Sequence, residues 1–281
     1  MKKKVKCNYK LLDCGNFEKL EQIGEMIFRR PALQANWKRK LHDDIWEKSH
    51  AKFDQSKKEW ATSTDYKLPK FECDFITLEL KLSSNGQIGI FPEQLANWQW
   101  IKDKISKSNR ELKILNGFAY TGASTLFAST AKTTLTHVDA SNSSVNWAKQ
   151  NSHLSNLGNN SIRWISDDII TFLSREVKRG SVYDGIILDP PAFGRGKKGS
   201  IWKLSKDLPQ LMCLIDQLLS NNPEFVILSC HDKNFGKHEL KQELTKLHKL
   251  KKGKIETLDL TITSKTGNNL PAGKCARWKR E

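Results

Sequence analysis

The sequence predicts an α/β fold. We expect a Rossmann-like, doubly wound, mostly parallel sheet that ends in an antiparallel β-hairpin, with a small β-rich appendage at the N-terminus. From Arg110 onward, short apolar segments typical of buried strands alternate with longer amphipathic segments typical of helices. After residue 250 this alternation stops, and two strand-like segments follow each other without a helix. The alternation predicts a parallel sheet covered on both faces, and the last pair predicts an antiparallel edge.

The first 110 residues give weaker signals. Residues 1–49 mix short apolar stretches with turn residues, and residues 50–70 are so polar that we expect a connector or an exposed loop. Residues 71–91 alternate apolar and polar side chains on both sides of the turn signal at 83–86, which predicts a β-hairpin. Residues 92–106 have helical spacing behind a proline. We therefore predict an appendage over 1–70, a hairpin and lead-in helix over 71–108, and a main domain over 109–281.

The main domain divides into elements as follows. Predicted parallel strands cover residues 111–118, 134–140, 161–167, 183–189 and 224–230. Predicted helices cover residues 123–131, 143–157, 168–179 and 207–220. Gly180 suits the end of the third of these helices. The two closing strands cover residues 254–263 and 272–280.

Composition narrows the class of protein. Hydrophobic residues make up 38% of the 281, enough for a folded core, so wholesale disorder is excluded. No apolar run approaches roughly 18 residues, so we expect no membrane-spanning helix and no membrane partner. The six cysteines form no C-x-x-C pair, so we expect no metal site and a reducing, cytoplasmic setting.

The charge balance predicts an RNA partner. Lys and Arg number 47 against 31 Asp and Glu, a net charge of +16, and the surplus concentrates in residues 1–10, 241–254 and 274–281. A positive potential of this kind recruits polyanions. A lysine-rich, solvated surface without a partner is the alternative. The sequence carries no signal for an oligomeric state.

Three successive predicted strands end in residues that suit a nucleoside ligand, which binds beyond the carboxyl ends of such strands. The first runs into the glycine-containing loop 116–123, where the chain turns tightly. The second ends at Asp139, a carboxylate that suits a ribose diol. The third ends near Asp168, placed to accept from an adenine amino group, with Trp164 as an apolar wall. The loop matches neither G-x-G-x-x-G nor a P-loop, which disfavours a nicotinamide dehydrogenase and a phosphate-binding loop.

The fourth strand ends in Asp189-Pro190-Pro191-Ala192-Phe193, where two prolines stiffen the loop that holds Asp189. With this motif the sequence resembles class I S-adenosylmethionine-dependent methyltransferases, and more narrowly the bacterial 23S ribosomal-RNA methyltransferase-like family. The resemblance runs from about Phe71 to Trp278. It is carried by GIFPEQLANW (89–98), NGFAYTGAST (116–125), THVDAS (136–141), ILDPPAFGRGKKGSIWKL (187–204), ILSCH (227–231) and LPAGKCARW (270–278).

The resemblance implies S-adenosylmethionine as cofactor and a catalysis that needs no metal. Gln94 approaches the cofactor, and Phe118, Tyr120 and Gly122 line its methionine end. Asp139 takes the ribose, Asp168 the adenine and Asp189 the reacting end. At Gly117 relatives often carry an apolar residue, which leaves this assignment intact.

The target atom decides the catalytic residues. A cytosine C5 carbon needs a thiolate to add at C6, and Cys230, at the end of the fifth strand, is placed for that role with His231 beside it. The alternative is a cysteine that only packs. If the acceptor is a nitrogen, for example of guanine, Asp189 accepts a hydrogen bond from the base amino group and Phe193 stacks on the base.

A basic strip follows this loop: Arg195, Lys197, Lys198 and Lys203. We expect it to grip RNA phosphates, with Trp202 anchoring the loop to the core. The sequence therefore predicts a cytoplasmic enzyme, an S-adenosylmethionine-dependent methyltransferase of RNA and above all of 23S ribosomal RNA. Two alternatives are a methyltransferase of a protein or small molecule, and a non-catalytic RNA-binding protein that retains the cofactor site.

Overall fold

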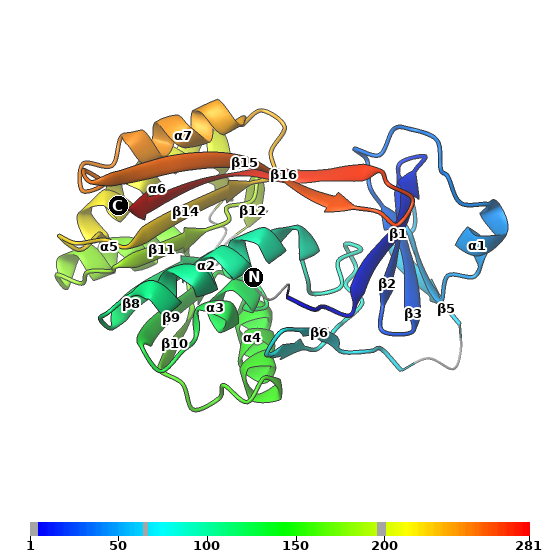
Figure 1. Ribbon diagram of the computed structural model, residues 1–281, viewed down its shortest axis with the longest axis horizontal. Helices are drawn as coiled ribbons and strands as arrows, with labels where there is room; N and C mark the ends of the chain where they lie inside the picture. Colours follow the sequence, from blue (N-terminus) through cyan, green and yellow to red (C-terminus); the bar gives the residue numbers. More distant parts are fainter. Residues whose placement is uncertain (1–4, 64–66, 196–200) are drawn as a thin grey trace. The chain divides into compact units, whose positions relative to one another are not determined.

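The computed structural model describes residues 5–63, 67–195 and 201–281 (Figure 1). The chain forms two compact units. Unit 1 comprises Met1–Glu93 and Thr261–Ala272, and unit 2 comprises Gln94–Leu260 and Gly273–Glu281. The divisions expected at residues 70 and 108 stay predictions.

Unit 2 is built on a seven-stranded sheet in the order β10-β9-β8-β11-β14-β16-β15 (Figure 1). Its strands are β8 (Leu112–Gly117), β9 (Thr133–Asp139), β10 (Ile162–Ser166), β11 (Gly185–Leu188), β14 (Phe225–Cys230), β15 (Gly253–Thr263) and β16 (Asn269–Arg280). The first five strands of that order are parallel, and β16 pairs antiparallel with β14. The predicted fold class is confirmed.

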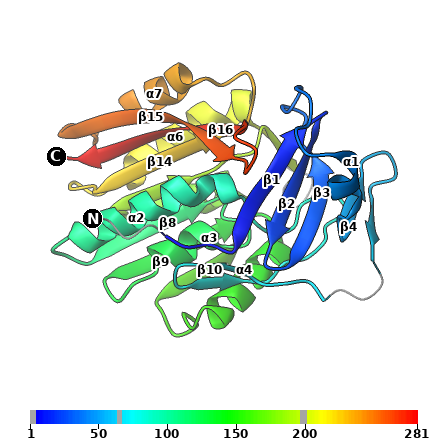
Figure 2. The same cartoon turned by 45° about the vertical axis from the view of Figure 1, so that its right-hand side comes forward.

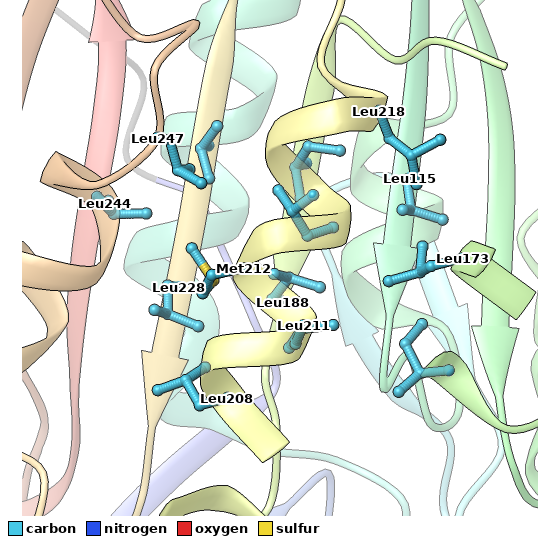
Figure 3. Packing of buried hydrophobic residues seen from close by; sticks show 14 of the residues in the cluster. Leu115, Leu173, Leu188, Leu208, Leu211, Met212, Leu218, Leu228, Leu244 and Leu247 are labelled. Carbon is cyan, nitrogen blue, oxygen red and sulfur yellow. The ribbon is translucent and has the colours of Figure 1, made fainter. Parts of the chain in front are cut away.

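Helices cover both faces of this sheet because its strands are apolar on both sides. The helices of unit 2 are α2 (Leu95–Lys107), α3 (Ala123–Ala128), α4 (Asn142–Leu154), α5 (Ile169–Lys178), α6 (Leu204–Leu218) and α7 (Lys237–Thr245). In β11, Ile186 and Leu188 join one cluster with α5, α6 and α7, whereas Ile187 joins another with α2 and α3. In the first cluster, Leu208 and Met212 of α6 lie over the sheet (Figure 3). The two-residue period of a strand explains this division.

Unit 1 contains a five-stranded sheet in the order β1-β2-β3-β4-β5, whose first strands lie side by side in Figure 2. The strands are β1 (Tyr9–Gly15), β2 (Glu18–Ile23), β3 (Met26–Pro31), β4 (Ala51–Asp54) and β5 (Glu59–Thr62), and a short helix α1 (Asp43–Glu47) precedes β4. The β-rich appendage is thus confirmed. The connector or exposed loop expected over 50–70 is wrong at β4 and β5, which are regular strands. In these two strands only Ala51 and Phe53 are buried. Two apolar side chains give no readable period.

The second segment of unit 1 completes its core. Leu270 packs with Leu11 and Cys14 in one buried cluster. The Lys265 N–H donates to the Leu11 carbonyl at 2.8 Å, and the Thr266 hydroxyl donates to Asp13 Oδ1 at 2.8 Å. The sheet of unit 1 therefore depends on residues from the far end of the chain.

The hairpin expected over 71–91 is shorter than predicted. Strands β6 (Phe71–Cys73) and β7 (Ile76–Leu78) pair antiparallel around a turn at Asp74, whose φ is 57°. The predicted turn at 83–86 does form, since the Gly86 N–H donates to the Ser83 carbonyl at 2.9 Å. No regular strand flanks it, and the alternation that suggested one long hairpin covers two successive turns.

Cys7 has a partner that its sequence context did not reveal. A disulfide joins it to Cys73, and the two residues form an isolated antiparallel bridge. The Asn8 N–H donates to the Glu72 carbonyl at 2.9 Å, so the two segments run side by side. A separation of 66 residues hides such a pairing from sequence reasoning. Among the described residues, no helix is long and apolar enough to cross a membrane.

Candidate active site

The candidate site lies where the strand order reverses, between β8 and β11. Gly117 at the end of β8 pairs with Leu188 of β11 on one side and with Val138 of β9 on the other. The next residues, Phe118 and Asp189 just after their strands and Asp139 as the last residue of β9, therefore lie together at the carboxyl ends of these strands. This is the topological switch point at which ligands bind in doubly wound sheets.

The loop after β8 holds an unusual backbone. Phe118, Tyr120 and Gly122 all have positive φ angles, of 56°, 48° and 89°. Residues other than glycine rarely adopt this left-handed backbone region, because it costs about 1–3 kcal/mol per residue. The residues that do adopt it are concentrated at functional sites. Gly122 has no alternative, since a Cβ there would lie 2.9 Å from the Ala148 Cβ. The three residues expected to line the cofactor's methionine end thus share one constrained loop.

Asp139 holds this loop in place. Its Oδ2 accepts from the Tyr120 N–H at 2.8 Å, and its Oδ1 accepts from the Ser141 N–H at 2.9 Å. Burial raises the pKa of Asp139, while those two backbone hydrogen bonds act in the opposite direction. The carboxylate at the end of β9 is therefore already fixed in position.

Trp164 lies within β10 and Asp168 lies two residues after the end of that strand, and both have structural partners. Asp168 caps α5, since its Oδ1 accepts from the Thr171 N–H at 2.9 Å. The Trp164 ring lies 4.8 Å from the ring of His137. The adenine roles of both residues stay predictions.

Asp189 meets two side chains from other elements. Gln94, which is 5% exposed at the start of α2, donates from Nε2 to Asp189 Oδ2 at 2.9 Å. His231, directly after β14, has its Nε2 3.3 Å from Asp189 Oδ1. That Oδ1 is buried and accepts no hydrogen bond among the described residues. Because buried polar atoms are nearly always paired, this oxygen marks a place for a donor. Gly273 leaves room for His231, since a Cβ there would lie 3.0 Å from His231 Nδ1.

Cys230 lies in the core rather than on an open surface. It is 1% exposed and belongs to the cluster that includes Leu204 and Leu208. Burial and the nearby carboxylates of Asp232 and Asp189 raise its pKa to about 11. A reactive thiolate needs a lowered pKa, so these surroundings favour the packing alternative.

The loop after Asp189 forms a small hairpin that the sequence did not predict. Strand β12 (Phe193–Arg195) pairs antiparallel with β13 (Ile201–Lys203). Phe193 is 52% exposed, whereas Trp202 is 8% exposed, and its Nε1 donates to the Pro191 carbonyl at 2.7 Å. The Trp202 ring also lies 4.9 Å from Phe118. Trp202 therefore anchors the loop, as expected, and leaves Phe193 available for stacking.

Only part of the basic strip can be placed. Lys203 is exposed immediately before α6. Lys197 and Lys198 lie outside the described residues, and of Arg195 only the backbone is described. The role of these four residues in RNA binding stays a prediction.

His137 is a buried polar residue that could not be singled out from the sequence, because most of the histidines stand in polar contexts that indicate solvated side chains. It is fully buried on β9, where its Nδ1 lies 2.9 Å from the Thr125 hydroxyl, and its Nε2 has no hydrogen-bond partner among the described residues. Burial lowers its pKa to about 3. The ring is therefore neutral in the folded protein under ordinary conditions.

We expect this histidine to make the protein acid-sensitive. Between pH 6.5 and 3 the unfolded chain binds a proton at His137 and the folded chain does not, so the free energy of unfolding falls as pH drops. The slope is about 1.4 kcal/mol per pH unit for one proton. Urea titrations from pH 7 to 4.5 should show His137→Gln flattening this slope, whereas the exposed His238→Gln should not. An unchanged slope in His137→Gln contradicts the assignment.

Known proteins match the chain over most of its length. The sequence profile of the S-adenosylmethionine-dependent methyltransferase family matches residues 13–255. The structure of the SAM-dependent methyltransferase from Agrobacterium tumefaciens is 31% identical, with a TM-score of 0.92, and the match covers 98% of this chain and 91% of that one. These matches confirm the cofactor class that the strand-end motifs indicated.

Curated relatives match a smaller share of their own length. The Ribosomal RNA large subunit methyltransferase K/L of Shewanella sp. (strain MR-4) is 28% identical over 207 residues, which are 70% of this chain and 28% of that protein. The Ribosomal RNA large subunit methyltransferase K of Neisseria meningitidis serogroup B is 29% identical over 123 residues, or 43% of this chain and 35% of that protein. The chain thus spans about a quarter to a third of these relatives. From the family profile and the Agrobacterium structure, the chain belongs to the S-adenosylmethionine-dependent methyltransferase family and is an enzyme that uses this cofactor.

Proposed function

We propose that the protein methylates a nitrogen atom of a base in RNA, and above all in ribosomal RNA. One observation carries the choice of atom. The carboxylate of Asp189 is held at the switch point, and its Oδ1, 3.3 Å from His231 Nε2, accepts no hydrogen bond from the part of the chain that the structure describes. The thiol that carbon methylation would need is instead buried with a raised pKa. A carboxylate suits an amino group, which donates hydrogen bonds.

The RNA part of the proposal rests on charge and on relatives. The net charge is +16, and exposed lysines gather on and after α7, namely Lys241, Lys246, Lys251, Lys252 and Lys254. Two curated relatives are named as ribosomal RNA methyltransferases. A surface of this sign attracts a phosphate backbone through counterion release. A cytoplasmic location remains a prediction.

The residues at the strand ends fit the cofactor. Asp139 offers carboxylate oxygens for a ribose diol, and the loop from Phe118 to Gly122 brings backbone groups close to the same edge. When bound, S-adenosylmethionine supplies a methyl group already activated by its sulfonium. No group of three or more His, Cys, Asp or Glu among the described residues is arranged to hold a metal ion. We assign Gln94 and Asp189 to the reacting end.

The residues of the protein then have to align the nitrogen of the base with the methyl group of the cofactor. Asp189 accepts a hydrogen bond from the amino group of the base, which directs the nitrogen lone pair, and the exposed Phe193 stacks on the ring. The nitrogen loses a proton on methylation, and we assign the Asp189 carboxylate as its acceptor, with His231 Nε2 3.3 Å from Asp189 Oδ1. A base inside a stacked helix must turn outward to reach this position.

The test is to identify the labelled nucleoside. Protein-free ribosomal RNA is incubated with methyl-labelled S-adenosylmethionine and the enzyme, then digested. We expect label in an N-methylated nucleoside, and Asp189→Asn should lower the rate at least about tenfold through misalignment of the base. Asp259→Asn, which changes a carboxylate with a 54% exposed side chain on β15, should leave it unchanged. Labelled 5-methylcytidine would overturn the choice of nitrogen, and unlabelled RNA would overturn the RNA proposal.

The thiol of Cys230 provides an independent prediction. With a pKa of about 11, only about one thiol in a thousand is ionised at pH 8. We expect iodoacetamide at pH 8 to modify the exposed Cys213 and spare Cys230, as read by mass spectrometry. Cys230→Ala should retain methyl transfer. In the wild-type enzyme, the rate should not rise tenfold per pH unit between pH 7 and 9, as it would if the Cys230 thiolate were the nucleophile. Loss of activity in that variant, with its fold intact, would restore Cys230 as the nucleophile.

A further inference from the structure

A chain of buried side chains leads from β16 to the loop of Asp189. Arg277, 6% exposed, donates from Nε to Asn97 Oδ1 at 2.7 Å. Asn97, 2% exposed on α2, donates from Nδ2 to Gln94 Oε1, and Gln94 donates from Nε2 to Asp189 Oδ2. All four residues belong to unit 2.

The two ends of this chain fix the direction of every hydrogen bond in it. A guanidinium only donates, so the amide oxygen of Asn97 must face Arg277 and its nitrogen must face Gln94. Gln94 then presents its oxygen to Asn97 and its nitrogen to the carboxylate, which only accepts when ionised. The two amides have one orientation that satisfies all four residues.

Burial of the Arg277 guanidinium costs free energy of folding. A buried cation is destabilising unless its charge is compensated. Its contacts are incomplete: Nη1 lies 3.6 Å from Glu256 Oε1, the guanidinium lies over the Trp100 ring at 5.4 Å, and Nη2 has no hydrogen-bond partner among the described residues. A role in setting the Asn97 amide accounts for a cation here better than packing does.

We propose that Asn97 and Arg277 are positioning residues for methyl transfer, which act by holding Gln94 so that its N–H donates to Asp189. Neither side chain needs to touch cofactor or base. This inference rests on the proposed role of Asp189. It assigns a function to a buried pair that lies within the motifs 89–98 and 270–278 and had no predicted role.

Asn97→Asp is the decisive change. The new carboxylate keeps the acceptor for Arg277 and has nearly the same shape, but it offers an oxygen where Gln94 needs a donor. Gln94 must then turn its amide, so that its oxygen faces the Asp189 carboxylate and the hydrogen bond is lost. We expect kcat to fall about tenfold to a hundredfold, as misplacement of a reacting group does. Glu256→Gln alters the other partner of Arg277, which is not part of this series of hydrogen bonds, and its kcat should stay within about twofold of wild type.

A double-mutant cycle separates positioning from general damage. If Asn97 acts through Gln94, Asn97→Asp should add nothing to the loss caused by Gln94→Ala, because coupled residues are not additive. Thermal unfolding and binding of S-adenosylhomocysteine to each variant report whether the fold is retained. Multiplying effects in the double variant, or an Asn97→Asp enzyme within twofold of wild type, would overturn the proposal.

A second readout does not need a methyl acceptor. The side-chain amide resonances of Gln94, identified by their loss in Gln94→Ala, should shift in Asn97→Asp and hold their wild-type positions in Glu256→Gln. If wild-type enzyme fails to methylate RNA, the proposed function fails and this spectrum alone decides the positioning role. Unshifted Gln94 resonances in Asn97→Asp would then overturn it.

Discussion

Asp139→Ala should abolish useful cofactor binding. The carboxylate would accept two hydroxyl hydrogen bonds from the ribose, and hydrogen bonds to a charged group contribute about 1.5–3 kcal/mol each. Their loss corresponds to roughly a hundredfold to ten-thousandfold in Kd for S-adenosylhomocysteine, measured by calorimetry. The change also removes the acceptor for the Tyr120 N–H, and with it a restraint on the left-handed loop.

Asp184 provides the matched control. It lies just before β11, at the amino ends of the parallel strands and so opposite the candidate site. It likewise accepts a hydrogen bond from a backbone N–H, that of Lys113, at 3.0 Å. Asp184→Ala should lower stability and leave the Kd unchanged. Since burial raises the pKa of Asp139, cofactor affinity should weaken on acidification at a higher pH than an ordinary aspartate would give. Equal affinities for wild type and Asp139→Ala would remove Asp139 from the site.

Glu21→Gln should be strongly destabilising in unit 1. Glu21 is fully buried, with Arg30 at 2.7 Å, Lys19 at 2.9 Å and the Tyr9 hydroxyl at 2.8 Å. Burial by itself raises its pKa, but the two cations outweigh that effect, and the pKa falls to about 2. Loss of this anion removes the hydrogen-bonded partner of two largely buried cations, at a cost of about 3–5 kcal/mol. Hydrogen exchange of peptides covering residues 18–31 measures this in the full-length protein.

Glu47 is the matching change at the surface. It pairs with Arg29 on the same sheet, but its side chain is 69% exposed, so Glu47→Gln should alter exchange little. The contribution of Glu21 is lost as pH falls from 4.5 through 2, because its pKa is lowered in the folded state. If Glu21→Gln and Glu47→Gln exchange at the same rate, the buried cluster does not stabilise unit 1.

The parallel sheet was predictable because its strands are apolar on both faces and its helices are long enough to show a period. Residues 185–188 and 225–230 are continuous buried runs, and Gly180, two residues after the last residue of helix α5, has the expected positive φ of 66°. Strands β4 and β5 escaped prediction because they bury too few side chains to leave a pattern. Helix α7 was hidden because Leu240 and Leu244 are its only apolar residues, and its polar and charged residues suggested only a charged surface.

In the candidate site, too, some residues could be predicted from the sequence and others could not. Asp139 and Asp189 could be predicted to converge because parallel topology brings the ends of β9 and β11 to one edge. The contacts of Asp189 with Gln94 and His231 are between side chains from distant parts of the sequence, and no spacing rule encodes them. Asn97 and Arg277 were missed for that reason, since a polar residue in an apolar helix or strand carries no sign of its partner.

The hairpin of β15 and β16 affects the order in which the protein can fold as it is made. Strands β1 to β5 of unit 1 are synthesised before Gln94–Leu260, yet Leu270 of the unit 1 core and Thr266, the partner of Asp13, are synthesised only after that segment. Contacts of such long sequence separation form slowly. Unit 1 is therefore completed only after Gln94–Leu260 has been synthesised, and until then its apolar core residues stay exposed to solvent or are bound by chaperones.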